Sequence, residues 1–238
     1  MDEIRGPMAG RVVVITGATG KLGPTVAERF AAEGATLALL ARDEESCIGV
    51  AMGLPGGIQR HRGFPVDLSD PESATAAADS VREKLGPPHV LLHLVGNYAG
   101  GVSFDEFALD EWHRLLDVNL MSTVHAARAF LPDIRAAKNG RLITMSTPLA
   151  TAPPTNVAAY AATKAAVESL TMSIAKELAG TTATANVVLV RTIGDGKATY
   201  TRPAEIAAAM LWLCSPQAGP MNGQRLPLVG RADTPKGT

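Results

Sequence analysis

The sequence predicts a single α/β domain: a doubly wound parallel sheet of about seven strands with helices on both faces. Along the 238 residues, short apolar runs alternate with longer stretches of helical character. The run at 12–16 is apolar or β-branched throughout, which is typical of a parallel strand buried on both faces. A glycine-rich turn follows it directly. Because crossovers between parallel strands are right-handed, few topologies remain, and a Rossmann-type fold is the leading one.

The first half of the chain is expected to hold four strands and three helices. In the first helix, Val26, Ala27 and Phe30 share one face. Asp70 can cap the third, Pro71 suits its first turn, and Gly86-Pro87-Pro88 stops it. The expected strands lie at 12–16, 36–41, 60–66 and 90–95, and the expected helices at 21–33, 43–52 and 71–85.

The second half continues the alternation after a glycine-rich loop at 96–108. A long helix is expected first, and an alanine-rich helix lies between the next two strands. The expected helices lie at 110–130, 157–179 and 204–213, and the expected strands at 141–145, 186–190 and 225–229. Since no linker interrupts this pattern, we expect one domain over 11–230, with a flexible extension at 1–10 and a loose tail at 231–238.

Composition excludes several classes of partner. Lysine plus arginine number 22 and aspartate plus glutamate 23, so the net charge of −1 gives no reason to expect nucleic acid or a membrane surface. The apolar runs are far shorter than the ~18 residues that a membrane span needs. Cys47 and Cys214 lie far apart without metal-ligand spacing, and the first residues resemble no signal peptide. We therefore expect a cytoplasmic protein without a metal site.

The turn after the first strand reads Thr-Gly-Ala-Thr-Gly-Lys-Leu-Gly over 16–23. Glycines let the backbone approach a pyrophosphate, and the following helix start offers free N–H groups and a positive dipole end. Its place between the first strand and the first helix makes this pattern specific. The expected contacts are Gly17, Thr19, Gly20, Lys21 and Leu22.

The end of the second strand bears on the choice of cofactor. NAD sites usually carry a carboxylate there, whereas this chain has Ala41 followed by Arg42. A guanidinium suits a 2′-phosphate, and Lys21 adds a second cation. Asp43 comes one position late and can instead cap the next helix. The sequence therefore favours NADP(H), with NAD(H) possible.

Tyr160 and Lys164 are candidates for acid–base chemistry. Residues four apart share a helix face, so the ammonium is expected near the phenol. A cation at ~4 Å can lower the tyrosine pKa from about 10 by roughly enough to deliver a proton near neutral pH. Neither Tyr98 nor Tyr200 has a lysine at that spacing.

Taken together, the motifs resemble those of the short-chain dehydrogenase/reductase family, and the resemblance covers 11–230. Their order along the chain makes the match specific. Besides the glycine turn and the Tyr160–Lys164 pair, the matching segments are Asp67-Leu68, Asn119 within Asp117-Val118-Asn119, the strand at 140–147, and the closing segments at 221–224 and 226–230.

The resemblance implies hydride transfer between a nicotinamide and a carbonyl or alcohol carbon. It makes Tyr160 the acid, with Lys164 lowering its pKa and holding the nicotinamide ribose. Asn119 would hold a water beside Lys164 and complete a proton relay. The further cofactor contacts that it implies are Asp67, Leu68, Val95, Gly96 and the backbone of Ile193.

The active-site hydroxyl is open between two neighbours. The family's serine precedes the tyrosine by about thirteen residues, which here selects Thr147, with Ser146 beside it. Thr147 is favoured on spacing, although it carries an extra methyl and precedes Pro148. Either side chain can donate a hydrogen bond to a substrate oxygen.

Three stretches depart from the family pattern. The glycine spacing is more typical of an extended, epimerase-like branch, for whose substrate domain this chain is short. After the fourth strand, Gly96-Asn97-Tyr98-Ala99-Gly100-Gly101 is similar to a loop of dihydropteridine reductases. His93 before it can lie near the adenosine or pack in the core, and Tyr98 can line the substrate pocket or merely cover the loop.

The segment after the sixth strand is short. About ten residues, 193–202, precede the next helix, so the family's helical lid is nearly absent. Arg191 there can be a surface residue, or can reach the pyrophosphate or an anionic substrate. We therefore expect an open site that takes a bulky substrate or is partly covered by a neighbouring subunit.

The sequence thus predicts an oxidoreductase acting on a small carbonyl or alcohol substrate. The alternative is a non-catalytic NAD(P)-binding regulatory protein on the same scaffold, and an epimerase-like enzyme is a third reading. The resemblance also implies a homodimer or homotetramer. The helices expected at 110–130 and 157–179 can pack across a two-fold axis, or their small apolar residues can pack only against the sheet.

Overall fold

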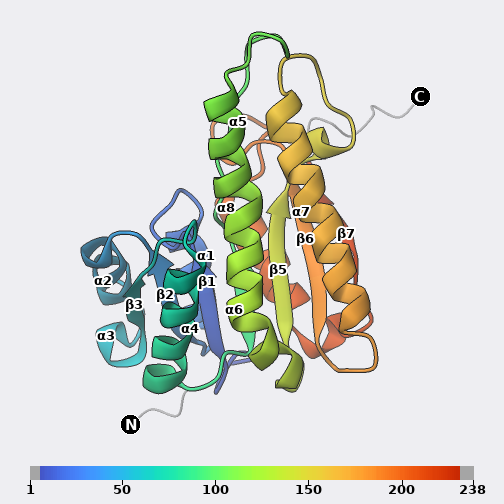
Figure 1. Ribbon diagram of the computed structural model, residues 1–238. Helices are drawn as coiled ribbons and strands as arrows, with labels where there is room; N and C mark the ends of the chain where they lie inside the picture. The colour runs from blue at the N-terminus through green and yellow to red at the C-terminus, as the bar shows by residue number, and fades with distance from the viewer. Residues whose placement is uncertain (1–5, 231–238) are drawn as a thin grey trace.

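One parallel sheet organises the protein, whose computed structural model describes residues 6–230. The strands are β1 (Val12–Thr16), β2 (Thr36–Ala41), β3 (Arg62–Pro65), β4 (Val90–His93), β5 (Arg141–Ser146), β6 (Thr184–Val190) and β7 (Arg225–Leu228). They pair in the order β3-β2-β1-β4-β5-β6-β7 (Figure 1). The order reverses between β1 and β4, and a parallel sheet of this kind binds ligands beyond the carboxyl ends of its strands at that point.

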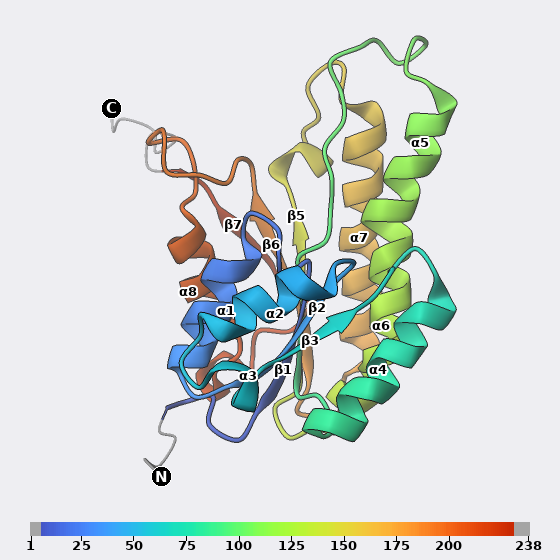
Figure 2. The same cartoon turned by 90° about the vertical axis from the view of Figure 1, so that its left-hand side faces the viewer.

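The helices cover both faces of the sheet, as the sequence predicted. Figure 2 shows α1, α2 and α8 on one side of the sheet and α4, α6 and α7 on the other. No helix in residues 6–230 is both long and apolar enough to cross a membrane. The helices are α1 (Gly23–Ala32), α2 (Glu44–Met52), α3 (Gly57–Arg60), α4 (Pro71–Leu85), α5 (Leu109–Leu115), η1 (Leu116–Met121), α6 (Ser122–Ala136), η2 (Pro148–Ala150), α7 (Ala158–Glu177), α8 (Pro203–Leu213) and η3 (Pro216–Ala218).

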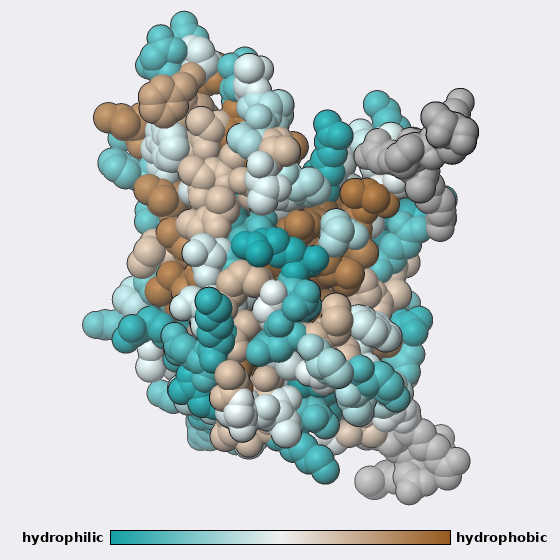
Figure 3. Space-filling view, turned by 90° about the vertical axis from the view of Figure 1, so that its right-hand side faces the viewer, coloured by the Kyte–Doolittle hydropathy of each residue, from teal (hydrophilic) through white to brown (hydrophobic). Residues whose placement is uncertain are grey.

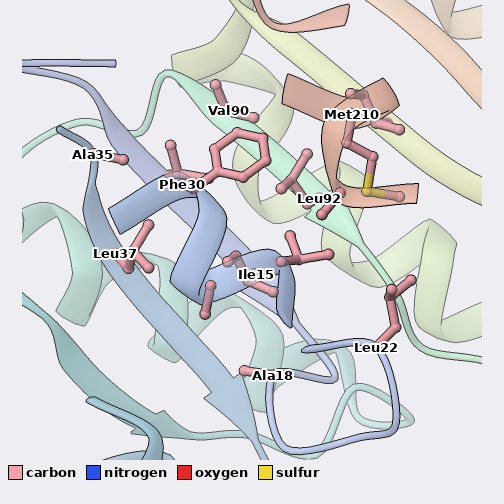
Figure 4. Close-up of a cluster of buried hydrophobic side chains, with 14 of the residues drawn as sticks. Ile15, Ala18, Leu22, Phe30, Ala35, Leu37, Val90, Leu92 and Met210 are labelled. Atoms are coloured by element: carbon pink, nitrogen blue, oxygen red, sulfur yellow. The ribbon is translucent and has the colours of Figure 1, made fainter. Parts of the chain in front are cut away.

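Two hydrophobic cores form because successive strand residues point to opposite faces. Val13 and Ile15 of β1 belong to the core under α1 and α8, whereas Val12 and Val14 belong to the core under α4, α6 and α7. Figure 4 shows the first of these cores, where Phe30 of α1 and Met210 of α8 lie beside the sheet.

The long helix expected at 110–130 is wrong in detail. The structure has three consecutive pieces, α5, the π-helical η1 and α6, and the last runs on to Ala136 with Pro132 inside it. A π-turn inserts a residue into the helical repeat and is frequent at functional sites. Here η1 carries the buried Asn119.

Strand and domain limits also differ from expectation. The strand expected at 60–66 is four residues long, and the one expected at 90–95 ends at His93. Met8 is 1% exposed and packs in the first core, and its N–H donates to Glu33 O at 2.9 Å. The packed domain therefore begins before residue 11. Residues 1–5 of the expected extension and the tail at 231–238 lie outside the described residues.

Candidate active site

A cavity of about 900 Å³ lies beyond the carboxyl ends of the central strands. It begins beside the glycine turn and ends beside Tyr160 and Lys164. All the residues expected to bind the cofactor line it: Gly17, Thr19, Gly20, Lys21, Leu22, Arg42, Asp67, Leu68, Val95, Gly96, Tyr160, Lys164 and Ile193. Segments far apart in sequence thus meet where the strand order reverses.

The glycine turn leads into the N-terminus of α1. Gly17 has a φ of +67°, which favours glycine, and a side chain at Gly23 would lie 2.2 Å from the carbonyl oxygen of Ala18. No side chain caps the N-terminus of α1. The N–H of Gly23 already donates to Gly20 O at 3.2 Å and Pro24 has none, so α1 offers an anion mainly the positive end of its dipole. Lys21 extends from this turn and donates to Ile193 O at 2.6 Å, which bridges the turn to the segment after β6.

The ends of β2 and β3 form the opposite end of the cavity. Asp43 accepts a hydrogen bond from the N–H of Ser46 at 2.9 Å, so it caps α2, the structural role open to it in the sequence. Asp67 accepts from the N–H and hydroxyl of Ser69, which lowers its carboxyl pKa, and the positive charge of Arg42 lowers it further. Arg42 thus places a positive charge at the cavity. The neighbouring carboxylates, Asp43 and Asp67, each accept hydrogen bonds from a nearby serine.

Tyr160 and Lys164 lie on one face of α7, toward the end of β5. Lys164 is buried, and its ammonium donates to Met145 O at 3.2 Å. Burial lowers the Lys164 pKa to about 8. A side chain at Gly96 would come within 2.7 Å of the Lys164 nitrogen and would push the ammonium aside.

The expectation that Lys164 lowers the pKa of Tyr160 differs from what the structure shows. Burial and the neighbouring Tyr98 raise the Tyr160 pKa, and a hydrogen bond with Thr147 acts in the opposite direction. The ammonium is turned to the Met145 carbonyl, and removing a phenol from water disfavours its charged form. Desolvation is therefore the largest influence on the Tyr160 pKa, and Lys164 is not among the groups that lower it.

The two candidate hydroxyls point to different partners. Thr147 lies near enough to the Tyr160 phenol to lower its pKa, whereas Ser146 donates to Glu168 Oε1 at 2.7 Å. Ser146 lines the cavity, but its hydroxyl is committed to the buried Glu168 carboxylate. Thr147 itself is fully buried behind the cavity wall, with its hydroxyl at the phenol.

The oxygen and the nitrogen of the Asn119 side-chain amide are both hydrogen-bonded to other protein groups. Its Oδ1 accepts from Asn97 N at 2.8 Å, and its Nδ2 donates to Asn97 O at 3.0 Å and to Thr163 Oγ1 at 3.1 Å. It is buried and does not line the cavity. These bonds fix the loop between Gly96 and Tyr98, so the Asn119 side chain holds backbone where the resemblance implied that it holds water.

His93 and Tyr98, each with two possible roles from the sequence, have different positions. His93 is buried between the hydroxyls of Thr16 at 2.9 Å and Ser122 at 3.3 Å, and burial, with Lys164 adding to it, lowers its pKa to about 3. It belongs to the core. Tyr98 lines the cavity, is 57% exposed, and packs edge-on against Tyr160 with ring centroids 5.0 Å apart.

Some residues of the site escaped the sequence reasoning. Glu168 is the most informative of them, because it binds Ser146. It lies four residues after Lys164, and that spacing was the one available signal. Arg114 and Asp117 also line the cavity.

The segment after β6 folds back on itself. Gly194 N donates to Thr201 O at 3.0 Å, and Thr201 N donates to Thr192 O at 2.9 Å. Val190, Arg191 and Ile193 line the cavity, and residues 194–202 do not. As the sequence predicted, residues 191–202 form no helical lid, and Arg191 is exposed at the rim.

The fold and this cavity define a nucleotide-binding oxidoreductase of the Rossmann class. The family model described as short chain dehydrogenase matches residues 11–199. The chain therefore belongs to the short-chain dehydrogenase/reductase family, whose members transfer hydride with a nicotinamide cofactor.

The similar proteins include several alcohol and polyol dehydrogenases. The meso-2,3-butanediol dehydrogenase of Serratia marcescens is 32% identical over 95% of this chain and 96% of its own length. The D-threitol dehydrogenase of Mycolicibacterium smegmatis is 29% identical over 93% of this chain and 92% of its own.

Solved structures superimpose over nearly the whole chain. A short chain dehydrogenase from Burkholderia cenocepacia in complex with NADP has a TM-score of 0.87 at 26% identity, covering 96% of this chain and 100% of that one. The L-sorbose reductase from Gluconobacter frateurii, complexed with NADPH and L-sorbose, has a TM-score of 0.86 at 25% identity, covering 96% and 98%.

Proposed function

We propose that this protein is an NADP(H)-preferring oxidoreductase that interconverts a small-molecule carbonyl and its alcohol. One observation carries the proposal: a single cavity joins Arg42 and the glycine turn at one end to Tyr160 and Lys164 at the other. The same cavity has the glycine turn and the positive end of the α1 dipole that a pyrophosphate needs, so the residues present fit a dinucleotide.

The cofactor preference rests on Arg42. Its guanidinium can form charge-assisted hydrogen bonds to a 2′-phosphate. In Asp43, the nearest carboxylate in sequence, Oδ2 is engaged with Ser46 at the start of α2. The similar structures whose titles mention a cofactor contain NADP, NADPH or NAD+, so they do not favour one cofactor. The proposed preference for NADP(H) therefore rests on residues of this chain.

The proposed chemistry assigns each side chain one task. The nicotinamide, when bound, donates or accepts the hydride at the reacting carbon. Tyr160 donates its phenolic proton to the carbonyl oxygen in reduction and accepts it in oxidation. Thr147, buried behind the cavity wall, lies beside the phenol and lowers its pKa, so it supports the proton donor from outside the cavity. Lys164 binds the nicotinamide ribose and keeps a positive charge near the phenolate that forms.

Asn119 supports this arrangement from behind the cavity wall. By fixing the backbone of Asn97, it holds Gly96 against Lys164 and Tyr98 against Tyr160. We assign it a positioning role, with its place in a proton relay resting on the family resemblance. Ile193 offers its N–H to the carboxamide while its carbonyl accepts from Lys21. We further propose a homodimer or homotetramer located in the cytoplasm.

The test is NADPH oxidation against a panel of ketones, aldehydes, quinones and a quinonoid dihydropterin. Tyr160→Phe removes the transferable proton, so we expect turnover to fall about 100-fold or more while NADPH binding, followed by its fluorescence, stays within about twofold. Wild-type protein with NADH gives the cofactor comparison, and a preference for NADH would overturn the role given to Arg42. Tight NADPH binding without turnover of any carbonyl would favour the regulatory alternative.

A further inference from the structure

Three ionisable or polar side chains on α7 face the end of β5. Tyr160, Lys164 and Glu168 are spaced four residues apart and therefore share one helix face. Each meets the end of β5: Tyr160 lies beside Thr147, which lowers its pKa, Lys164 donates to the Met145 carbonyl, and Glu168 accepts from Ser146. The proposed function uses the first two, and Glu168 has no role in it.

Glu168 has a buried carboxylate, and each of its oxygens accepts a hydrogen bond. It is 2% exposed, and its two carboxylate oxygens have different partners: Oε1 accepts from Ser146 Oγ at 2.7 Å, and Oε2 accepts from Arg225 Nε at 2.5 Å. Arg225 comes from β7 and its side chain is 45% exposed. Taking a carboxylate out of water disfavours folding, and apolar side chains of similar volume often serve stability better. Stability alone thus gives little reason for this pair.

The Ser146 contact links Glu168 to the reacting groups. A hydroxyl donates only one hydrogen bond, and the Ser146 hydroxyl lies closer to Glu168 than to the Lys164 carbonyl at 3.3 Å. Ser146 is the last residue of β5, and Thr147 follows it directly. Fixing Ser146 therefore fixes the direction in which Thr147 leaves the strand toward the phenol.

We propose that Glu168, held by Arg225, is a positioning residue that acts through Ser146 to keep Thr147 against Tyr160. The proposal rests on the proposed function in that it treats Tyr160 as the reacting group. It adds two residues, Glu168 and Arg225, that do not touch the substrate and yet set the geometry of the proton donor. Misplacing a reacting group by a fraction of an ångström is costly in rate even where binding is unchanged.

The chain offers a matched control on the same two elements. Thr171, on α7 just beyond Glu168, bonds to Thr144 of β5 with hydroxyl oxygens 2.9 Å apart, and both side chains are fully buried. Neither lines the cavity or contacts Ser146. Thr171→Val therefore breaks a buried polar contact between α7 and β5 without disturbing the Ser146 contact.

The variants separate charge from hydrogen bonding. Glu168→Gln keeps an acceptor for Ser146 and removes the charge, while Glu168→Leu removes both. We expect Glu168→Leu to lower kcat about tenfold or more, with KM for NADPH within about twofold, and Glu168→Gln to recover most of that loss. Thr171→Val is expected to lower the melting temperature and leave kcat within about twofold. Equal kcat losses in Glu168→Leu and Thr171→Val at equal loss of melting temperature would overturn the proposal.

Two further measurements test the proposal if Glu168→Leu does not fold or if the wild-type protein shows no turnover. Arg225→Gln leaves Glu168 in place without its partner, and we expect it to lower kcat in the wild-type background but not in the Glu168→Gln background, because the neutral amide needs no counter-charge. Additive losses would contradict the proposal.

The second measurement needs no turnover. Ultraviolet titration, with Tyr160→Phe in each background identifying the signal, reports the pKa of Tyr160, which the Thr147 hydrogen bond lowers. Glu168→Leu should raise that pKa and Thr171→Val should not. A raised pKa together with an inactive wild type would refute the proposed function and leave the positioning role standing. An unchanged pKa would refute the positioning role.

Discussion

At the scale of single residues, Lys164 shows how function and stability oppose each other. Its ammonium is buried and makes one hydrogen bond, to Met145 O, so burial lowers its pKa to about 8. In the unfolded chain a lysine has a pKa near 10.4. Below pH 8 both states carry the proton, and the full cost of burying the charge opposes folding. Between pH 8 and about 10.4 only the unfolded state keeps the proton, so this cost declines as pH rises.

Lys164→Met is therefore expected to abolish turnover and yet stabilise the fold. At pH 7 we expect the free energy of unfolding to rise by on the order of 2 kcal/mol, because an apolar side chain replaces a buried charge. The gain should shrink as pH rises from 8 toward 10. Urea unfolding of both proteins at pH 7 and at pH 10 measures this gain in the free energy of unfolding. Lys176→Met, an exposed position on the same helix, is the control, and a less stable Lys164→Met at pH 7 would refute the argument.

The sequence could identify Tyr160 and Lys164 but could not choose between Ser146 and Thr147. Spacing along a helix places a phenol and an ammonium on one face whatever surrounds them. The choice of hydroxyl depends on Glu168, more than twenty residues along the chain, which turns Ser146 away from the phenol. The sequence could not choose between the two roles of His93 for a similar reason. Its two hydroxyl partners come from β1 and α6, which only the folded sheet brings together.

At the scale of secondary-structure elements, Arg141 joins β5 to the end of α8. It is fully buried, and its guanidinium donates to Leu213 O at 3.0 Å, Ser215 O at 3.1 Å and two further carbonyls. Carbonyls at a helix end have no partner within the helix, and a cation there also suits the negative end of the dipole. Arg141 thus completes the C-terminus of α8 from the neighbouring sheet.

Arg141→Met should cost about 2–4 kcal/mol of unfolding free energy, since it leaves several buried carbonyls without donors. Urea denaturation followed by circular dichroism measures the change. Arg135→Met is the control: that arginine is exposed and pairs with Glu177 at 3.4 Å, so we expect a loss under about 1 kcal/mol. A loss for Arg141→Met no larger than that of the control would show that water or rearrangement replaces the guanidinium.

Element boundaries were harder to predict than element types. Apolar periodicity indicated a helix over 110–130, and helical structure does cover it, but the π-turn of η1 left no trace in the periodicity. In the structure, the η1 residue Asn119 bonds to the backbone of Asn97, a contact across the fold that no local pattern encodes. Similarly, β4 ends at His93, two residues before the limit expected from the apolar run.

At the scale of the whole molecule, the topology could be predicted almost completely. Alternating strands and helices, with a glycine turn after the first strand, allow few arrangements, and the observed order places the cavity where the strand order reverses. The substrate could not be predicted in the same way. Its end of the cavity is formed by loops, and their conformation depends on contacts such as those of Tyr98 and Arg191 with their surroundings.

The proposed oligomer has two candidate faces. The helices α6 and α7 lie side by side on one face of the sheet (Figure 1), and Met121 is exposed at the junction with η1. The other face is the sheet edge at β7, followed by Val229, which is 56% exposed. Figure 3, which views the molecule from the side of this edge, shows hydrophobic side chains gathered near its middle. An exposed strand edge and an exposed apolar patch are both features that a partner subunit can cover.

Light scattering on the purified protein is expected to give two or four times the chain mass of 24.7 kDa. Met121→Glu and Val229→Glu then locate the interface, because a two-fold contact places the substituted charge next to or near its own copy and destabilises the association. If α6 and α7 form the contact, Met121→Glu lowers the mass and Val229→Glu does not; a contact at the β7 edge gives the reverse. A mass of 24.7 kDa for the wild type at micromolar concentration would exclude the oligomer and leave the cavity to be completed by this chain alone.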